Sequence, residues 1–561
     1  MRIKRIICFA CFFLLLGTCA SEIVTVDSGP QIPNRPNILW IVAEDLSPII
    51  PPFGDFTVET PNLTRLAAEG VRYSNVFSTS GVCAPSRATI ALGTYQNRVG
   101  AQHMRTMRPS SAAPFPGQVT AYEAVPPPQM KMHSQYFREA GYYTSNNAKE
   151  DYQFRKPVTA WDESSNAAHW RNRAPGQPFF SIFNLGITHE SQVWMQQENS
   201  LLVPEDLEVP VPPYLPDTEV SLRDIRQVYS NIVAMDRQVG EILQQLEEDE
   251  LLDNTIVFFY SDHGGPLPRQ KRLLYDSGIN LPMIIRFPDG WRAGEVDDQL
   301  ISFVDFKSTA LSLGGIEPPD YVDGRAFLGD FLDLPKRSYI HAAADRLDAQ
   351  YDTIRAVRDS RYKYLRNYNI DRTYYLELPY REQMTIMQEL LRLRDAGQLN
   401  EIQAQWFRAQ KAPEELFDTE NDPHELKNLA MDPHFQGKLA ELRAEMDIWL
   451  NEIDDKGFIP EVELIEEFWP GGIQPITLDP VVSHRNGMVH VSSATLGANI
   501  AYQLLTDEQE LGNSWRLYSE PLRLSQNQQL FTVAHRIGYA PSEVVSYQEV
   551  RQQKLTEQPA Q

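Results

Sequence analysis

The clearest pattern along the chain is a set of short apolar runs that each end in polar residues. These runs lie at residues 38–42, 179–183, 256–260 and around Ile284. Uninterrupted apolar runs of this length are typical of strands that are buried on both faces of a parallel sheet. Between them, apolar residues recur at spacings of three and four, which is the pattern of an amphipathic helix. The clearest helix carries Ile225, Val228, Ile232, Met235, Val239, Ile242 and Leu246.

Alternating strands and helices predict an α/β fold with a mostly parallel central sheet flanked by helices. In such folds the functional groups gather beyond the carboxyl ends of the strands. We expect this unit to span residues 36–350.

The pattern changes after residue 350. "YDTIRAVRDSRYKYLRNYN" predicts a hairpin of half-exposed strands, and charged helical stretches follow near residues 382–410 and 436–453. We therefore expect a smaller α+β subdomain over residues 351–455. "FWPGGIQP" is interpreted as a linker, and short alternating runs over residues 476–552 predict an appended small β domain.

The first 20 residues have the pattern of a signal peptide. "MRIKR" is a basic start, "IICFACFFLLLG" is an apolar stretch too short to span a bilayer, and "TCASE" offers a cleavage site after Ala20. "LGTC" also resembles a lipoprotein box, in which Cys19 would carry a lipid anchor. The protein is predicted to be exported, as a periplasmic or secreted protein or as a surface lipoprotein.

Composition narrows the function. The chain has 561 residues and a net charge of −24, and loss of the signal peptide would make it more negative still. This argues against nucleic acid as a partner. A polyanionic substrate would need a local basic pocket set against the overall field.

Cysteine usage draws attention to one residue. Cys8 and Cys11 lie in the signal peptide and Cys19 at its edge, which leaves Cys83 for the mature chain. An internal disulfide is therefore not expected, although the predicted compartment is oxidising. Cys83 is then either a small buried apolar residue or a reactive group.

Two strand ends carry candidate metal ligands. Glu44 and Asp45 follow the first apolar run, and Asp262 and His263 follow the third. Oxygen-rich sites favour Ca²⁺ or Mg²⁺ and can include a histidine. The alternative is that these are solvated acids that cap nearby helices, but two such pairs after similar runs favour a metal.

The segment around Cys83 resembles the sulfatase family. "CAPSR" matches the family's cysteine-x-proline-x-arginine signature, in which the cysteine becomes formylglycine. "RPNILWIVAEDLS", "GYYTSNNAKED", "YSDHGG", "KRLLYDSGINLPMIIRFP" and "EELFDTENDPHELKNLA" follow in family order, so that the resemblance covers roughly residues 36–450. It implies the alkaline phosphatase-like fold and a formylglycine-generating maturation enzyme as a partner.

The resemblance also implies roles for individual residues. Cys83, as the hydrated aldehyde, would supply the attacking hydroxyl and an oxygen ligand to one Ca²⁺ ion. The other ligands implied for this ion are Glu44, Asp45, Asp262 and His263. Arg87 would steady the nucleophile, Lys149 and Lys271 would hold the sulfate, and His189 would lie beside the leaving oxygen.

The sequence departs from the family pattern at several positions. Glu44 stands where aspartate is commoner and His263 where asparagine is usual. Asp151 replaces a histidine two residues after Lys149. His103 is a candidate substrate-binding residue to fill that space, although a loop position without function is the equal alternative.

"AEDLSP" and "AKEDYQF" look most like bacterial relatives of heparan N-sulfatase. The resemblance therefore implies a carbohydrate sulfatase that acts on O- or N-linked sulfate of a polysaccharide, either an algal polymer such as ulvan or a glycosaminoglycan, or on its oligosaccharides. Two alternatives stay open: a phosphatase or phosphodiesterase of the same superfamily, and a non-catalytic protein that binds sulfated glycan.

Overall fold

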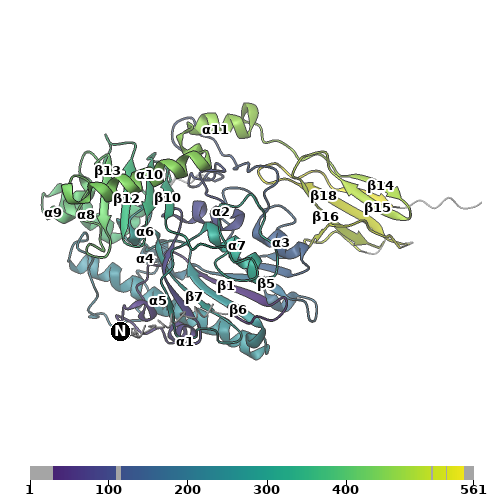
Figure 1. The fold of residues 1–561 in the computed structure, drawn as a ribbon, viewed down its shortest axis with the longest axis horizontal. Helices are drawn as coiled ribbons and strands as arrows, with labels where there is room; N and C mark the ends of the chain where they lie inside the picture. Colours follow the sequence, from purple (N-terminus) through teal and green to yellow (C-terminus); the bar gives the residue numbers. More distant parts are fainter. Residues whose placement is uncertain (1–28, 109–114, 507–508, 526, 549–561) are drawn as a thin grey trace, which may run out of the picture.

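The structure, a computed structural model, describes residues 29–108, 115–506, 509–525 and 527–548 (Figure 1). The predicted signal peptide and the alternative lipid-attachment residue Cys19 lie outside these ranges. Among the described helices, none combines the length and the apolar character needed to cross a membrane.

A central sheet organises the first part of the chain. Its strands run in the order β4-β3-β5-β1-β6-β7-β2-β8, and β9 pairs with β2. Their bounds are β1 (Asn37–Ala43), β2 (Val71–Phe77), β3 (Tyr143–Asn147), β4 (Glu163–Ser164), β5 (Phe179–Leu185), β6 (Thr255–Ser261), β7 (Asn280–Arg286), β8 (Val296–Asp297) and β9 (Ile301–Ser302).

Strand directions confirm the predicted fold class, with one exception. The neighbours β3, β5, β1 and β6 are parallel, as the apolar runs indicated. β7, the run around Ile284, is antiparallel to both β6 and β2, so the expectation that it is a parallel strand was wrong. β7 follows β6 after a loop excursion that returns to the same end of the sheet, which reverses its direction.

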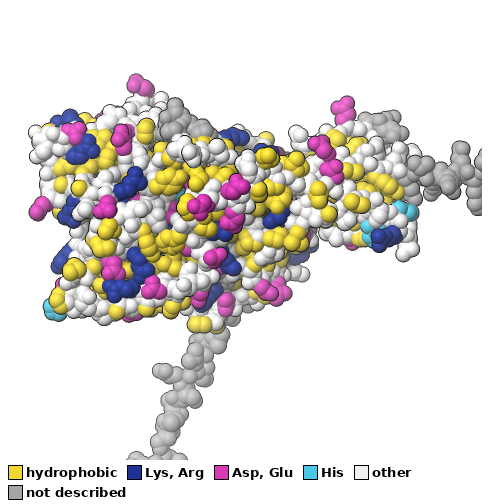
Figure 2. Space-filling model, turned by 90° about the horizontal axis from the view of Figure 1, so that it is seen from above, with side chains coloured by type: hydrophobic (Ala, Val, Ile, Leu, Met, Phe, Trp, Pro, Cys, Tyr) yellow, Lys and Arg dark blue, Asp and Glu magenta, His cyan; other side chains and the backbone are white. Residues whose placement is uncertain are grey.

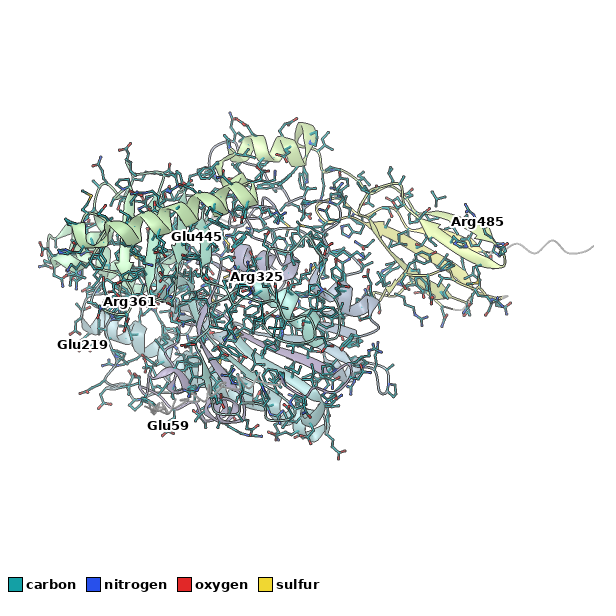
Figure 3. All side chains as sticks on the ribbon, viewed as in Figure 1. Glu59, Glu219, Arg325, Arg361, Glu445 and Arg485 are labelled. Carbon is teal, nitrogen blue, oxygen red and sulfur yellow. The ribbon has the colours of Figure 1, made fainter. Side chains whose placement is uncertain are left out.

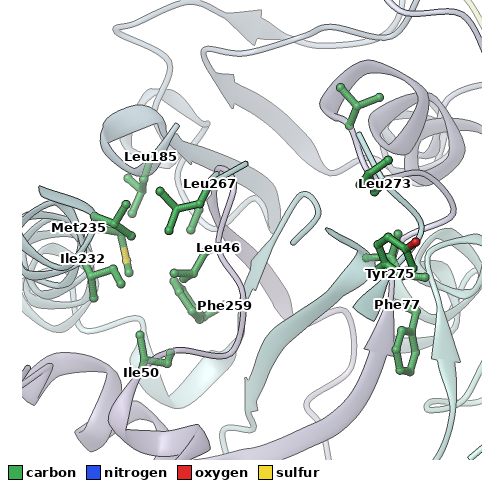
Figure 4. Close-up of a cluster of buried hydrophobic side chains, with 14 of the residues drawn as sticks. Leu46, Ile50, Phe77, Leu185, Ile232, Met235, Phe259, Leu267, Leu273 and Tyr275 are labelled. Carbon is green, nitrogen blue, oxygen red and sulfur yellow. The ribbon is translucent and has the colours of Figure 1, made fainter. Parts of the chain in front are cut away.

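Alternate residues of β1 face two separate hydrophobic clusters. Leu39 and Ile41 pack toward α1 (Pro61–Glu69) and α5 (Glu219–Glu248), whereas Ile38 and Trp40 pack toward α2 (Cys83–Leu92), α3 (His133–Glu139) and α7 (Val304–Leu313). The predicted apolar stripe of α5 is buried throughout. Figure 4 shows part of the first cluster, in which Ile232 and Met235 of α5 lie near Phe259 of β6. Helices on both faces therefore fix the sheet and leave its carboxyl edge for function.

A second sheet, β10-β11-β12-β13, lies beside the first. The strands are β10 (Ile340–Ala344), β11 (Ile354–Arg358), β12 (Tyr362–Asn367) and β13 (Glu414–Asp418), with helices α8 (Thr385–Asp395), α9 (Glu401–Ala404) and α10 (Gln436–Ile453). β11 and β12 form the predicted hairpin, but β11 is fully buried rather than half-exposed, because α10 packs against it.

The last strands extend away from the main body (Figure 1). After α11 (Glu461–Phe468) come β14 (Val481–Arg485), β15 (Met488–Ser492), β16 (Asn499–Leu505), β17 (Arg516–Leu517), β18 (Gln529–His535) and β19 (Val545–Gln548). They form a two-stranded sheet and a four-stranded sheet ordered β17-β16-β18-β19. These strands, β14 to β19, are called the C-terminal sheets below. They fall within the range predicted for the small β domain.

Candidate active site

The polar residues that follow the central strands meet at the carboxyl edge of the sheet. β1 is followed directly by Glu44 and Asp45, and β6 by Asp262 and His263. Because β1 and β6 are adjacent and parallel, these two pairs lie side by side, and the backbone N–H of Asp45 donates to Asp262 Oδ1 at 3.1 Å. The short helices α4 (Ser191–Met195) and α6 (Asp276–Ile279) follow loops that leave the same edge.

Helix α2 places Cys83 in this group of side chains. Cys83 is the first residue of the helix and is buried. Its Sγ lies 3.4 Å from His263 Nε2 and 3.8 Å from Asp45 Oδ1. One ligand-type atom from each of Asp45, Cys83, Asp262 and His263 lies within 4.8 Å of the others. The structure thus brings together four of the five predicted ligands in a single buried cluster.

The donor set suits a divalent cation. Asp45 and Asp262 are fully buried, and Asp45 Oδ1 lies 2.9 Å from His263 Nε2. Burial disfavours a charged imidazole, but Asp45, Asp262 and Cys83 outweigh burial and raise the pKa of His263 to about 10. The carboxylates of Asp45 and Asp262 therefore stabilise a positive charge between them. Carboxylate oxygens with one histidine nitrogen are ligands that Ca²⁺ or Mg²⁺ accepts.

Glu44, the fifth predicted ligand, has a second partner. Its ligand atom groups with those of Asp45, Cys83 and His189, rather than with all four residues of the cluster above. Lys149 Nζ donates to Glu44 Oε2 at 2.6 Å. Glu44 therefore lies between the metal-type cluster and the predicted sulfate-binding lysine.

Lys149 lies in the loop after β3 and is about one-fifth exposed. Its pKa is raised, because the negative charges of Cys83, Glu44 and Asp262 outweigh burial and the nearby Arg87. Asp151, which replaces the family's histidine, lies 3.9 Å from Lys149 Nζ. The ammonium is thus held charged by acids around the site.

Arg87 lies one helical turn after Cys83 and points into the same site. Its Nε donates to Asp262 Oδ2 at 3.0 Å and its Nη1 donates to Asn184 Oδ1 at 2.7 Å. Arg87 Nη2 is buried and has no hydrogen-bond partner among the described residues. A buried guanidinium nitrogen without a partner is costly, so Arg87 Nη2 is free to donate to a bound anion.

His189 and Lys271 lie together beside Asp45. Lys271 Nζ is 3.2 Å from His189 Nε2 and donates to Asp45 Oδ2 at 2.5 Å. His189 Nδ1 is 2.9 Å from Ser191 Oγ. The pKa of Lys271 is raised, because Asp45, Cys83 and Glu190 outweigh burial. A protonated lysine beside an imidazole nitrogen is a suitable source of a proton.

The electrostatics also affect Cys83. Burial alone would raise the pKa of its thiol, but Lys149 and Lys271 lower it to about 6 despite the nearby carboxylates. The site is therefore built to stabilise negative charge at this position, as a site for an anionic nucleophile or substrate requires.

The sequence interpretation missed a chain of buried charges next to the site. Glu190 lies 3.3 Å from Lys271 and pairs through both carboxylate oxygens with Arg272, whose Nε donates to Asp348 at 2.9 Å. Asp45, Arg272 and Asp348 all have positive φ. For residues other than glycine such backbone strain concentrates at functional sites. The available signal was Glu190, which directly follows His189 in the sequence.

His103 lies elsewhere. Its ring is buried, its Nδ1 accepts from the backbone N–H of Arg346 at 3.3 Å, and it packs against Tyr351. No described hydrogen bond or ring contact joins it to Lys149 or Asp151, whereas it contacts Arg346 and Tyr351. Burial lowers the pKa of His103 to about 4, with Glu461 opposing and Arg346 adding to the shift. The loop turns this residue into the core rather than into the site.

An α/β sheet whose carboxyl edge gathers a buried cysteine, converging carboxylates and several cations is typical of hydrolases of the alkaline phosphatase-like superfamily. The chain belongs to the sulfatase family within it. The family model described as Sulfatase matches residues 36–316, and a model described as N-sulphoglucosamine sulphohydrolase, C-terminal, matches residues 269–406.

Known relatives agree with this assignment. An ulvan-active sulfatase of Formosa agariphila is 51% identical over 550 residues, which cover 92% of this chain and 91% of that protein. The human N-sulphoglucosamine sulphohydrolase is 24% identical over 484 residues, which cover 78% and 95% of the two chains. The predicted family and the predicted enzyme class, a sulfatase, are confirmed.

Solved structures share the fold. A protein solved in complex with its substrate D-glucosamine-2-N,6-O-disulfate aligns with a TM-score of 0.53 and 16% identity, covering 76% of this chain and all of that one. A 2-O glycosaminoglycan sulfatase aligns with a TM-score of 0.52 and 20% identity, covering 75% and 93%. At this identity the likeness concerns the fold alone.

Proposed function

We propose that this sulfatase is an exported, formylglycine-dependent, Ca²⁺-binding enzyme that releases sulfate from a sulfated polysaccharide or its oligosaccharides. Ulvan is the first candidate polymer. The observation that carries this choice is the 51% identity with an ulvan-active sulfatase over nearly the full length of both chains. The roles assigned to single residues below are part of the proposal.

Binding of the sulfate group is assigned to the cations that surround Cys83. Lys149 is partly exposed and charged, and Arg87 Nη2 has no partner among the described residues. Both can neutralise the oxygens of a sulfate ester in a largely buried site, where such interactions are stronger than in water. Asp45, Asp262, His263 and Glu44 would hold Ca²⁺, which would add positive charge beside the sulfate.

The nucleophile is assigned to Cys83 after its conversion to formylglycine by a maturation enzyme. The hydrated aldehyde would supply one hydroxyl to attack sulfur and a second whose loss of a proton expels sulfate. Arg87, fixed by Asp262 and Asn184, would orient this group from one helical turn away.

Proton delivery to the leaving oxygen is assigned to the pair of Lys271 and His189. Their side chains are 3.2 Å apart and both lie beside Asp45. Ser191 Oγ, at 2.9 Å from His189 Nδ1, fixes the ring so that Nε2 faces Lys271. General acid catalysis by a positioned group typically contributes about 10²- to 10⁴-fold in rate.

The first test is the mass of the peptide that contains Cys83, from protein made in its native host. An aldehyde at Cys83 is expected. A thiol in every molecule would contradict the maturation proposal in that host and would make the glycan-binding alternative the stronger one.

The substrate test compares sulfate release from ulvan oligosaccharides, from O-sulfated glycosaminoglycan and from N-sulfated glucosamine. Release from ulvan is expected to be fastest. Preference for the N-sulfate would instead place the enzyme with the family described by the second matching model. Hydrolysis of an aryl phosphate faster than the matching aryl sulfate would favour the phosphatase alternative.

The metal proposal has a readout that does not need activity. Ca²⁺ should raise the melting temperature of the wild type, because an ion that binds only the folded state stabilises it. Asp262→Asn, which removes a negative charge from the buried cluster, should abolish most of this shift. A shift that is equal in both proteins would place the ion elsewhere.

Export is tested by the N-terminus of the protein recovered from its host. A chain that starts at residue 21 is expected from signal-peptide cleavage. A lipid on Cys19 would identify the lipoprotein form, and an intact first methionine would contradict export.

A further inference from the structure

Arg105 lies at the rim of the candidate site and has an incompletely used guanidinium group. Its side chain is 31% exposed. Nε donates to Asp348 Oδ1 at 2.9 Å, whereas the two terminal nitrogens have no described hydrogen-bond partner. A guanidinium held through Nε alone still presents a pair of N–H donors that match the two oxygens of a carboxylate or sulfate.

An aromatic residue links Arg105 to the catalytic side chains. Arg105 Cζ lies 5.0 Å from the centre of the Tyr380 ring, within the range of a cation–π contact. The same ring lies 6.5 Å from the ring of His189 and 5.2 Å from that of Trp194. Arg105 is therefore on the side of the site that would receive the sugar released as the leaving group.

The position of Arg105 is fixed by strained backbone on both sides of an ion pair. Asp348 is fully buried and binds Arg105 and Arg272 at once. φ is 57° at Arg105, 54° at Asp348 and 75° at Arg272. Three left-handed residues other than glycine in one hydrogen-bonded chain indicate a geometry that the surrounding structure enforces, as is common at ligand sites.

Charge indicates what Arg105 binds. The chain carries a net charge of −24, and Figure 2 shows acidic and basic side chains interspersed over one face of the molecule. A polyanion is repelled by such a surface unless cations are placed along its path. Lys149 and Arg87 serve the reacting sulfate, which leaves Arg105 for a further anionic group.

We propose that Arg105 forms a second oxyanion subsite, which binds a carboxylate or a second sulfate on the sugar unit next to the one that is desulfated. The proposal rests on the proposed function, because it requires a polyanionic polysaccharide as substrate. Tyr380 and Trp194 would contact the sugar ring between the two anions. Arg105 would thus decide which neighbouring sugar is accepted, while the chemical step remains with the groups around Cys83.

The test compares Arg105→Gln with the wild type on three kinds of substrate. The first is an oligosaccharide in which the sugar next to the reacting sulfate ester carries a carboxylate and a second sulfate. The second kind is the same compound with either the carboxyl reduced or the second sulfate removed. The third is an aryl sulfate. We expect R105Q to lower kcat/KM about 10- to 100-fold on the intact oligosaccharide. On the aryl sulfate, which has no second anion, kcat/KM should change by less than about threefold. Arg105→Lys keeps the positive charge but lacks the paired N–H donors of the guanidinium. Its kcat/KM on the intact oligosaccharide should lie between those of R105Q and the wild type.

Arg361→Gln is the matched control, because Arg361 is also a half-exposed arginine that pairs with an aspartate, Asp418, and has no described contact with the site. Tyr380→Leu, which removes the ring under Arg105 and its proposed contact with the sugar, is a second variant. It should lower kcat/KM on the oligosaccharides, with or without the second anion, more than on the aryl sulfate. If the loss of kcat/KM in R105Q vanishes on the carboxyl-reduced compound, the anion that Arg105 binds is a carboxylate. If the loss vanishes only when the second sulfate is removed, the anion is that sulfate.

A loss that is equal on all substrates, the aryl sulfate included, would make Arg105 a structural residue and overturn the proposal. So would an R105Q enzyme that treats the intact oligosaccharide like the wild type. Failure of the proposed function is distinguishable from both, because the wild type would then hydrolyse the aryl sulfate but no polysaccharide fragment.

Discussion

The candidate site and the C-terminal sheets are built on opposite principles. At the site, charged side chains are buried: Asp262 and Glu190 have no exposed surface, and Lys271 and Arg272 have about 2%. In the C-terminal sheets, strands such as β16 alternate between buried and half-exposed residues. Their own core is a small apolar cluster around Val489, Val491 and Leu530.

The join between the two regions combines polar contacts with the burial of Ile537, which follows β18, in the hydrophobic cluster of the main body. Arg138 Nη2 donates to the backbone carbonyl of Trp515 at 2.6 Å, and Trp469 Nε1 donates to that of Gly538 at 3.2 Å. A side chain at Gly497 would collide with the backbone of Pro128, so this approach requires glycine. The comparison teaches that the two regions are stabilised differently: charged side chains are buried at the site and in other ion pairs of the main body, such as Arg346 with Glu461, whereas the C-terminal sheets rest on an apolar cluster of their own.

The largest effect is expected from Cys83→Ala. Sulfate release should fall at least about 1,000-fold, because the nucleophile is lost while binding remains. The melting temperature should change little, since the side chain removed is small and lies in a polar cluster. Sulfate release and melting are measured on the same preparation. Turnover retained by C83A would remove Cys83 from the mechanism.

Arg272→Gln should have the next largest effect, this time on stability. It leaves Glu190 and Asp348 buried with fewer partners, and breaking a buried ion pair typically costs about 3–5 kcal/mol. Arg485→Gln, at the exposed outer end of the C-terminal sheets in Figure 3, is the control and should cost less than about 0.5 kcal/mol. Urea unfolding measures both. Equal costs would show that the buried chain of charges is not a stabilising unit.

The buried chain of Glu190, Arg272 and Asp348 could not be predicted from the sequence, unlike the metal-type residues. Glu44, Asp45, Asp262 and His263 were predicted because each pair directly follows an apolar run, and parallel strands place such residues together. Pairing of Glu190, Arg272 and Asp348 depends on how three loops pack, and no local pattern encodes that.

For the same reason, two features of the structure had no local signal in the sequence. An apolar run is the same whichever way a buried strand points, so β7 carried no signal of its antiparallel direction. A single histidine in a loop has no periodicity, so nothing in the sequence indicated that His103 turns into the core beside Arg346 rather than toward Lys149.

Leu530→Ala tests whether the C-terminal sheets contribute to stability without contributing to catalysis. Leu530 is fully buried in β18, and removing such a side chain typically costs about 2–5 kcal/mol. The loss should appear in thermal unfolding, while hydrolysis of an aryl sulfate at low temperature stays within about twofold. A proportional loss of activity would mean that the C-terminal sheets support the site directly.

The smallest effect is a pH dependence set by His133. Its ring is buried against Trp40, Trp161 and Phe180, and burial, with a contribution from Lys307, lowers its pKa to about 3. The folded state therefore resists protonation while the unfolded state accepts a proton below about pH 6.5. Stability from this residue is present above that pH and is lost as the pH falls toward 3.

His133→Phe removes the titratable imidazole and keeps an aromatic ring at this position. Between about pH 7.5 and about pH 5, the wild type should lose about 2 kcal/mol more unfolding free energy than the variant, because the unfolded histidine gains its proton over that range. Urea unfolding at the two pH values measures the difference. If the wild type and the variant lose the same unfolding free energy over this range, the folded protein also protonates His133. That requires water to reach a residue that is about 1% exposed.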